Sequence, residues 1–562
     1  MVENLFEHLS SERKELQEKD ELPAWFTTQA WQVFKTKYAY SGETFRGACN
    51  RVASTLATHT KNPSEWEQKF FSLLWEGHLA ASTPVLANVG TSRGCSVSCS
   101  GNFVDDSVYE FYETQKETAI LSQQGFGTSS YLGNIRPRGA SISQGGKASG
   151  VIPVLRGFVN VARDISQGGV RRGSWAGYYP IDGDDFWEII EEIKNKPDDL
   201  NIGWNVSNEF IQRLESGDTE AISRYQRALK IKCITGKGYF FFIDRVNEAN
   251  PPLYKELGLS VKASNLCIEI ALHSDKDHTF TCVLSSLNLS KWDEFKEDTI
   301  FNSLVFLDCV AEEFIEKGKN IRGLEKAVRF TEKARALGLG ALGFHTYLQK
   351  NSIPFESLDA QFLNDKIFKK IKEEAVRATK WLAEEYGEPE WCKGYGIRNT
   401  HLLAVAPNTT SALICGSVSQ GIEPVYKNVF NQGTASGEMN RINPTLLELL
   451  KEKGQYTEAV INSILEKKGS IQHLSFLSDH EKLVFKTAFE IDQKVIVRLA
   501  SLRQRYICQG QSLNLFFAAD EDEAYISEVH KLAFLDSYIK GLYYLRSEAG
   551  VQASKDCISC EG

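Results

Sequence analysis

The chain has 562 residues, of which 42% are hydrophobic and 24% charged, a composition that excludes wholesale disorder, a collagen and a disulfide mini-scaffold. The net charge of −9 supplies no global basic field for DNA or RNA. Residues 1–20 are polar and acidic, unlike a signal peptide, and no apolar run approaches the roughly 20 residues that span a bilayer. We therefore expect a cytosolic protein whose twelve cysteines stay reduced and are buried, catalytic or metal-binding.

Helical spacing of apolar residues, for example between Trp25 and Phe34, predicts helices over the first eighty residues. The composition of the sequence changes at Ala81, after which glycine-rich polar loops follow one another. Glycine at this density in loops indicates backbone packed close to a ligand. The loops cover residues 88–95, 125–139, 144–150 and 167–173.

Short strand-like runs alternate with helices beyond these loops. Residues 238–243 (GYFFFI) predict a buried strand, and residues 280–284 (FTCVL) predict another. Residues 361–386 predict a long amphipathic helix that ends at Gly387. This alternation predicts an α/β core. The last dozen residues lack apolar periodicity and predict a mobile tail.

The sharpest local pattern is residues 265–270 (NLCIEI). If this stretch is extended, Asn265, Cys267 and Glu269 share one face and three apolar residues share the other. An amide, a thiol and a carboxylate side by side can orient a hydroxyl, accept a proton and do sulfur chemistry. Taken alone, the hexapeptide favours the simpler interpretation of a half-buried strand with a core cysteine.

Other cysteines lie near the expected ligand-facing segments. Cys282 lies in the second predicted strand, and Cys99 follows the first glycine-rich loop. Each alone is more often an inert core cysteine, but several together indicate a site that uses more than one sulfur. Cys557 and Cys560 form a C-x-x-C in the tail, without a second ligand pair at zinc spacing nearby. A redox dithiol on a flexible arm fits this context better than a structural metal site.

Two segments predict helix N-termini, where free N–H groups and the helix dipole favour phosphate. The stronger is residues 406–412 (APNTTSA) and the weaker is residues 82–84 (STP), although each alone is more often a plain N-cap. The adjacent pair Tyr543 and Tyr544 ordinarily indicates packing. It gains interest only if a one-electron path to Cys267 is needed.

Eight motifs along the chain, in the order that the family has them, resemble the catalytic large subunit of class I ribonucleotide reductase, most closely its short phage-encoded forms. The resemblance implies an α/β fold: a ten-stranded α/β barrel of two antiparallel halves, each with five parallel strands, around a finger loop. It implies a helical region at 1–80 without an ATP cone, a catalytic barrel at 81–546 and a flexible redox tail at 547–562. The motifs are ASTPVLANVGT (81–91), VSCSGNFVDDS (97–107), SQGGVRRGSWAG (166–177), NLCIEI (265–270), TCVLSSLNL (281–289), APNTTSA (406–412), GLYYLR (541–546) and CISC (557–560).

The resemblance also implies the chemistry of these residues. Cys267 would be the transient thiyl radical that removes the ribose 3′ hydrogen, Glu269 the base at the 3′ hydroxyl, and Asn265 the amide that holds the substrate hydroxyls. Cys99 and Cys282 would supply two electrons as the 2′ hydroxyl leaves, and would become a disulfide.

The electron and radical supply follow from the same resemblance. Cys557 and Cys560 would reduce that disulfide and be reset by thioredoxin or glutaredoxin. Tyr543 and Tyr544 match the tyrosine pair that relays the radical from a metal-containing small subunit. This chain itself is expected to bind no metal and no tightly held cofactor.

Substrate and effector contacts complete the set. The diphosphate cradle matches Thr83, Asn408, Thr409, Thr410 and Ser411, although the better-known bacterial enzymes have serine and glutamate in place of Asn408 and Thr409. Gln167 and Arg171 match the substrate-contacting positions of the loop that carries effector identity to the active site. The effector's ribose matches Asp106, and its phosphates match the region of Arg136 and Arg138.

The implied partners are the small subunit, thioredoxin or glutaredoxin, ribonucleoside diphosphates, dNTP or ATP effectors and a second copy of the chain, without nucleic acid or membrane. The expected location is the cytoplasm, that of the host if the gene is phage-encoded. Three alternatives stay open: a cobalamin-dependent (class II) reductase, a non-catalytic nucleotide-binding protein, and a thiol–disulfide oxidoreductase acting through the tail cysteines.

Overall fold

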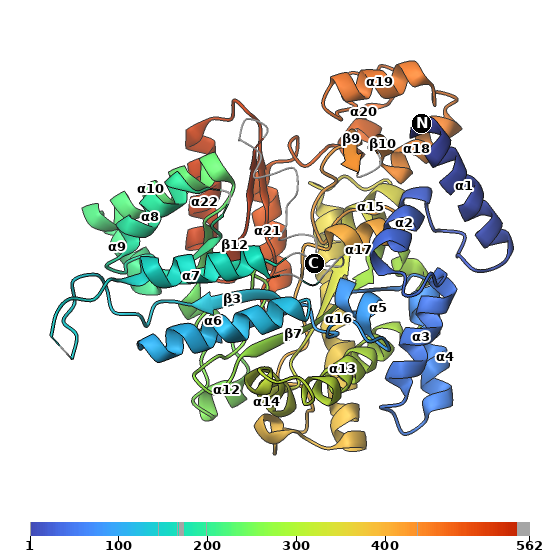
Figure 1. Cartoon of the computed structure of the whole chain (residues 1–562). Helices are drawn as coiled ribbons and strands as arrows, with labels where there is room; N and C mark the ends of the chain where they lie inside the picture. The colour runs from blue at the N-terminus through green and yellow to red at the C-terminus, as the bar shows by residue number, and fades with distance from the viewer. Residues whose placement is uncertain are drawn as a thin grey trace.

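A computed structural model describes residues 2–143, 145–165, 167, 173–197, 199–434 and 437–547, with side chains described outside 2–6 and 431–440 (Figure 1). Within these residues, no helix has both the length and the apolarity needed to cross a membrane. The predicted tail, including Cys557 and Cys560, lies outside the described residues, as does Arg171.

The predicted N-terminal helices are confirmed. They are α1 (Val2–Glu18), α2 (Thr28–Val33), α3 (Phe45–Ala57) and α4 (Pro63–Trp75). Their ends follow local chemistry, since Thr44 caps α3 by accepting a hydrogen bond from the Gly47 N–H and Pro63 opens α4. Aromatic side chains join the helices, with the rings of Phe26 and Phe45 4.7 Å apart.

Five parallel strands form the first half of the barrel. Helices connect consecutive strands, as parallel pairing requires. The strands pair in the order β2 (Cys99–Phe103), β3 (Gly127–Tyr131), β4 (Trp175–Pro180), β5 (Ile202–Val206) and β6 (Tyr239–Phe242).

A second parallel set closes the barrel. It runs through β7 (Phe280–Asn288), β8 (Leu337–Leu342), a bridge at Leu403, a bridge from Val405 to Gln511 that leads into β11 (Leu515–Phe517), and then β12 (Gly541–Leu542) and β13 (Leu545–Ser547). The two sets meet antiparallel at β2–β7 and at β6–β12. This arrangement confirms the expected α/β barrel of two antiparallel halves.

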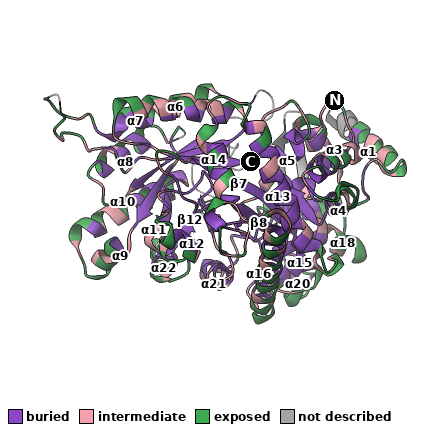
Figure 2. Ribbon diagram, turned by 90° about the horizontal axis from the view of Figure 1, so that it is seen from below, coloured by how far each residue is buried: buried purple, intermediate pink, exposed green. Residues whose placement is uncertain are grey.

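The remaining elements surround or flank the barrel, and Figure 2 shows buried residues along the strands and exposed residues on the outer helix faces. β1 (Leu79–Ala81) pairs with β7, while β9 (Val429–Thr434) and β10 (Gly437–Ile442) form a hairpin. The helices are α5 (Thr83–Asn88), α6 (Val108–Gln123), α7 (Val151–Asp164), α8 (Phe186–Asn195), α9 (Asn208–Glu215), α10 (Thr219–Thr235), α11 (Ile243–Glu248), α12 (Pro252–Glu256), α13 (Thr299–Gly318), α14 (Glu325–Ala334), α15 (Phe344–Lys350), α16 (Leu358–Tyr386), α17 (Thr409–Ile414), α18 (Pro444–Glu452), α19 (Glu458–Glu466), α20 (Asp479–Val484), α21 (Gln493–Gln504) and α22 (Glu523–Leu535).

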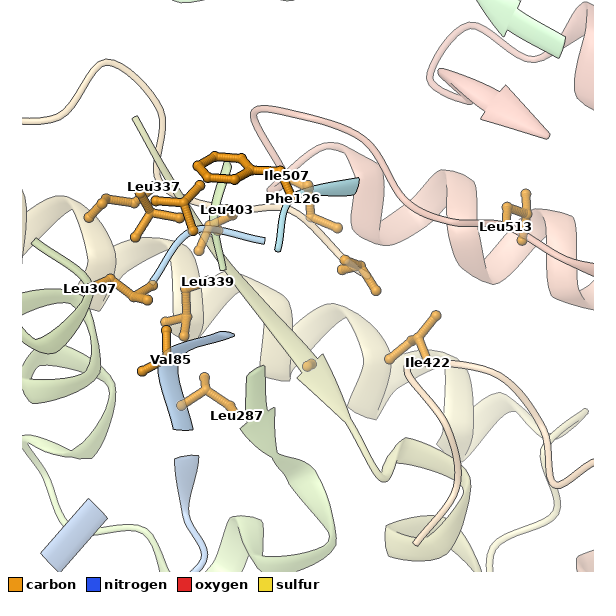
Figure 3. Packing of buried hydrophobic residues seen from close by; sticks show 14 of the residues in the cluster. Val85, Phe126, Leu287, Leu307, Leu337, Leu339, Leu403, Ile422, Ile507 and Leu513 are labelled. Atoms are coloured by element: carbon orange, nitrogen blue, oxygen red, sulfur yellow. The ribbon is translucent and has the colours of Figure 1, made fainter. Parts of the chain in front are cut away.

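The core joins both halves of the barrel. Figure 3 shows Phe126 from the first half close to Leu337 and Leu403 from the second. At the β2–β7 seam, a Cβ at Gly101 would lie 2.1 Å from the Phe280 ring, so only glycine fits there. The predicted strands at 238–243 and 280–284 correspond to β6 and β7, and the predicted helix at 361–386 corresponds to α16.

Candidate active site

Residues 265–270, which match the family's finger loop, form a turn rather than the extended segment that their alternating pattern alone would allow. Leu266 and Cys267 are the turn residues, and Ile268 has a left-handed backbone with φ of 68°. Asn265 explains the turn, because both of its oxygens accept hydrogen bonds within it. Its backbone oxygen accepts from the Ile268 N–H at 3.3 Å, and its side-chain Oδ1 accepts from the Ile270 N–H at 3.2 Å. These local bonds replace the ladder that a strand would need.

The turn still brings the amide and the carboxylate together, as the sequence predicts. Asn265 Nδ2 donates to Glu269 Oε1 at 2.9 Å, and both side chains are buried. The Ser512 hydroxyl donates to Glu269 Oε2 at 3.0 Å. A buried carboxylate needs such donors, because burial without hydrogen bonds penalises its ionised form.

The loop is held from both halves of the barrel. From β3, Ser129 Oγ donates to the Ser264 oxygen at 2.8 Å; from β4, the Tyr178 hydroxyl donates to the Asn265 oxygen at 2.6 Å. From the second half, the Gly510 N–H donates to the Glu269 oxygen at 2.7 Å. Burial raises the pKa of Tyr178 well above its usual value, so its hydroxyl remains a neutral donor at physiological pH.

Cys99 and Cys282 lie directly opposite each other at the β2–β7 seam. Opposed residues of antiparallel strands have Cα atoms about 4.5–5.5 Å apart, within the range that a disulfide spans. Both cysteines pack in one buried cluster with Ile270, which follows Glu269 in the finger loop. The fold therefore places a thiol pair of suitable geometry beside the loop that carries Cys267.

Tyr543 and Tyr544 belong to the same buried cluster as Cys267. Their ring centroids lie 4.2 Å apart, and Tyr239 of β6 packs against both, at 4.7 Å from Tyr543 and 5.4 Å from Tyr544. The buried ammonium of Lys232 donates to the backbone oxygen of Tyr543. Burial lowers the pKa of Lys232 to about 7.

The two predicted helix N-termini bond neighbouring residues of β7. The Ser82 N–H, at the start of α5, donates to Ser285 Oγ at 3.3 Å, and Ser286 Oγ donates to Asn408 Oδ1, at the start of α17, at 3.1 Å. Thr83 Oγ1 lies 2.9 Å from the Tyr38 hydroxyl, and Tyr38 lines a small cavity together with Ser411.

The five predicted diphosphate residues differ in how their side chains are used. Thr83, Asn408, Thr410 and Ser411 are buried, whereas Thr409 is partly exposed. Asn408 Nδ2 donates to the Ala406 oxygen at 3.0 Å, so its amide is engaged within the protein. Its φ of 57° is left-handed, a conformation that asparagine tolerates better than most residues.

Gln167 is buried beside the first glycine-rich loops. Its Nε2 donates to Asn88 Oδ1 at 3.3 Å, and a Cβ at Gly125 would lie 2.4 Å from its Oε1. Asp106 accepts a hydrogen bond from the Arg136 N–H at 3.2 Å and forms an ion pair with the Arg136 guanidinium at 2.5 Å. Arg138 instead pairs with Glu188 at 2.6 Å, so the structure joins only two of the three predicted effector residues.

One group among the described residues has metal-ligand chemistry, namely His273, Asp275 and His278. Asp275 Oδ2 lies 3.0 Å from His273 Nε2, and its Oδ1 lies 2.9 Å from His278 Nδ1. Oδ1 also accepts from two backbone N–H groups. Burial opposes ionisation, but these hydrogen bonds hold the pKa of Asp275 well below its usual range. The cluster is thus explained as a hydrogen-bonded carboxylate.

Sequence reasoning missed three residues that hold the site, namely Tyr178, Lys232 and Ser512. Tyr178 lies 87 positions from Asn265, and Ser512 lies 245 positions from Cys267. Lys232 lies 311 positions from Tyr543. No local pattern links partners at such separations. A lysine among apolar residues near the end of a helix was the one available signal.

Comparison with known proteins agrees with this geometry. The ribonucleotide reductase barrel domain matches residues 97–224, 219–393 and 389–545, and the family's all-alpha domain matches residues 24–94. The chain therefore belongs to the ribonucleotide reductase family.

Individual relatives define the class. The chain is 38% identical over 536 residues to a relative from Frog virus 3, covering 89% of this chain and 93% of the relative. It is 31% identical over 589 residues to the ribonucleoside-diphosphate reductase large subunit of Invertebrate iridescent virus 3, covering 88% and 92%. The solved class Id alpha subunit of Actinobacillus ureae superposes with a TM-score of 0.87 at 36% identity, covering 94% and 99%. The protein is a class I ribonucleoside-diphosphate reductase large subunit, and the cobalamin-dependent alternative is not favoured.

Proposed function

We propose that Cys267, as a thiyl radical, starts the reduction by taking the 3′ hydrogen atom of a ribonucleoside diphosphate. Glu269 accepts the proton of the 3′ hydroxyl, and Asn265 holds the substrate hydroxyls. The 2′ hydroxyl leaves as water with a proton from the Cys99–Cys282 pair. The second hydrogen of that pair replaces the hydroxyl at C2′, and the pair, having supplied two electrons, becomes a disulfide. Glu269 returns its proton to the 3′ oxygen, and Cys267 returns its hydrogen to C3′. The observation that carries this proposal is the buried Asn265–Glu269 pair in the turn that presents Cys267.

The radical enters through Tyr544 and Tyr543 from a metal-containing small subunit. Their shared buried cluster with Cys267 and the 4.2 Å separation of their ring centroids support this route. Cys557 and Cys560 of the tail reduce the Cys99–Cys282 disulfide and are in turn reset by thioredoxin or glutaredoxin. A buried disulfide requires such a carrier, since a large protein reductant cannot enter the barrel.

The substrate's diphosphate binds between the starts of α5 and α17, at Thr83 and Asn408 to Ser411. The bonds of both segments to neighbouring residues of β7, Ser285 and Ser286, support this location. Asn408 contributes through its backbone, because its side chain is engaged inside the protein. Gln167 and Arg171 report effector identity from the loop between α7 and β4.

A dNTP or ATP effector binds near Asp106, Arg136 and Arg138, at the interface of two copies of the chain. Val108, Tyr109 and Tyr112 of α6 are 69%, 70% and 68% exposed, an apolar set that a homodimer would cover. The helix begins two residues after Asp106, so the interface and the effector site adjoin. Viral relatives support activity in a host cytoplasm.

The proposed function divides the chain into three regions. The helical region spans 1–80, the catalytic barrel spans 81–546, and the redox tail spans 547–562. The barrel accounts for the enclosed radical site, since a thiyl radical must be kept from solvent and other reductants. The tail accounts for repeated turnover.

The decisive test is the Cys267→Ser variant, assayed with the cognate small subunit, CDP and a panel of dNTPs. We expect no dCDP formation and unchanged dNTP binding. Cys49→Ala, a change at another buried cysteine within α3, is the matched control and should remain active. Retained turnover in Cys267→Ser would refute the proposed chemistry.

A further inference from the structure

Ser512 lies where the second half of the barrel faces the finger loop. Its side chain is buried, and its N–H donates to the Val405 oxygen at 2.9 Å, which fixes the backbone. Its Oγ lies 2.7 Å from the Cys267 backbone oxygen and 3.0 Å from Glu269 Oε2. A single hydroxyl therefore reaches both the residue that carries the thiol and the carboxylate two positions later.

The Cys267 oxygen belongs to the peptide that precedes Ile268. Ile268 is β-branched and has a φ of 68°, a conformation that L-residues rarely adopt and that persists only when its surroundings enforce it. The bond from Ser512 fixes the orientation of this peptide. It therefore helps to keep the turn in the conformation that presents the Cys267 thiol.

The same chain segment holds the rest of the turn. The Gly510 N–H donates to the Glu269 oxygen at 2.7 Å, and Gln509 Oε1 accepts from the Ala271 N–H at 3.2 Å. A Cβ at Gly510 would lie 3.1 Å from the Glu269 oxygen, a tight approach that glycine permits. Residues 509–512 thus form a rigid support for the finger loop.

We propose that Ser512 is a positioning residue that couples the Glu269 carboxylate to the tip of the finger loop. This inference rests on the proposed roles of Cys267 and Glu269. A hydroxyl has one proton, which Ser512 can direct to Glu269 Oε2 while the carboxylate is ionised or to the Cys267 oxygen after Glu269 takes the substrate's proton. Reorientation of one hydroxyl lets the loop keep its shape while the base changes its protonation state.

Hydrogen bonds to an ionised carboxylate lower its pKa, so loss of one raises it. Glu269 receives such bonds from Ser512 and Asn265, and the titratable groups that interact with Tyr178 across this site include Tyr239, Cys267 and Glu269. Tyr178 titrates far above neutrality and cannot produce an acid limb in the pH profile. The acid limb of kcat/KM is therefore the property that Ser512 should control.

The experiment compares Ser512→Ala with the wild-type chain in the complete holoenzyme, with CDP and a fixed effector, across pH. We expect kcat to fall about 10- to 100-fold, as for loss of a hydrogen bond to a charged acceptor. The acid limb of kcat/KM should move up by about one pH unit, with little change in the KM for CDP. Ser512→Thr, which keeps a hydroxyl, should restore the acid limb.

Ser303→Ala is the matched control, because Ser303 is also buried and its hydroxyl bonds only a carbonyl of its own helix, that of Thr299. Thermal unfolding of each variant separates loss of function from loss of folding. An unchanged kcat and acid limb in Ser512→Ala would overturn the inference, as would an effect on KM alone. Glu269→Gln distinguishes failure of the inference about Ser512 from failure of the proposed function, because full activity in Glu269→Gln would refute the proposed function itself.

Discussion

The finger loop and the effector region are held together in opposite ways. Around the finger loop, the hydroxyl and amide groups of Tyr178, Asn265 and Ser512 donate to backbone oxygens or to the Glu269 carboxylate, and these side chains are all buried. Around the effector region, the bonds are ion pairs with exposed partners: the side chains of Arg136 and Arg138 are 38% and 51% exposed. One region is enclosed and fixed, whereas the other faces water.

The difference follows from what each region must do. A radical site must exclude water and keep its geometry, and buried hydrogen bonds provide both. An effector site must exchange its partners, and exposed ion pairs contribute only about 0–1 kcal/mol each. Under the proposed function, the Asp106–Arg136 pair can therefore open for a nucleotide at little cost. The proposed catalytic residues are thus held by buried hydrogen bonds, whereas the proposed effector residues form exposed ion pairs.

In the comparison of these two regions, the largest effect should come from neutralising the Glu269 carboxylate of the finger loop. Glu269→Gln keeps the size and the Asn265 contact but cannot accept a proton, so kcat should fall about 10²- to 10⁴-fold. The measurement is dCDP formation by the holoenzyme. Glu256→Gln, an exposed carboxylate that accepts from the Tyr395 hydroxyl, serves as the control and should keep full activity.

A buried ion pair tests whether burial, rather than the presence of charge, determines how much stability is lost when an interaction is removed. Asp308 pairs with Arg335 at 2.9 Å and with Arg398 at 3.0 Å, and all three are mostly buried. Asp308→Ala leaves two guanidinium groups without this partner and should lower the free energy of unfolding by about 3–5 kcal/mol. Chemical denaturation measures this change, and a loss below about 1 kcal/mol would contradict the comparison.

The same carboxylate predicts a pH dependence. Burial opposes its ionisation, but the two arginines outweigh burial and lower the pKa of Asp308 to about 2. Its folded pKa lies below the unfolded value of about 3.9, so its stabilisation is complete above about pH 4 and is lost as pH falls toward 2. Denaturation of the wild type and Asp308→Asn between pH 2 and 6 should therefore converge at the acid end. If the stabilities of the two proteins instead differed by the same amount at every pH, the Asp308 carboxylate would not be the origin of the pH dependence.

The start of α17 gives a smaller effect. Asn408→Ala places an alanine in a left-handed conformation and should be about 1 kcal/mol less stable than Asn408→Gly, which lacks this strain. Both variants lose the same amide, so the difference isolates the backbone. The KM for CDP should remain close to the wild-type value in Asn408→Gly, since the side chain bonds protein atoms. A large rise in KM would assign the amide to the diphosphate.

The smallest change in stability should follow from Arg138→Ala. Its ion pair with Glu188 is exposed on both sides, so the free energy of unfolding should change by less than about 1 kcal/mol. Effector affinity should fall nevertheless, because the proposed site places this cation near the effector's phosphates. Isothermal titration with a dNTP checks this, with Arg163→Ala as an exposed control in α7. Equal losses in both variants would remove Arg138 from the effector site.

The strands and long helices were predictable because their signals are local. Residues 238–243 and 361–386 carry apolar patterns that match β6 and α16. The turn of the finger loop could not be predicted from its local pattern, because an alternating pattern fits an extended segment as well as a turn capped by Asn265; only the family resemblance implied a loop there. The Cys99–Cys282 register and the contacts of Ser512 depend on distant strands, so they follow only from the assembled barrel. Motif resemblance supplied the residue identities, and the fold supplied their neighbours.

The most direct test of the central claim uses the complete holoenzyme and the 2′-azido analogue of CDP, followed by electron paramagnetic resonance. A thiyl radical at Cys267 predicts a nitrogen-centred signal in the wild type and its absence in Cys267→Ser. A wild-type holoenzyme that turns over CDP yet gives no nitrogen-centred signal, or an equal signal in Cys267→Ser, would contradict the account.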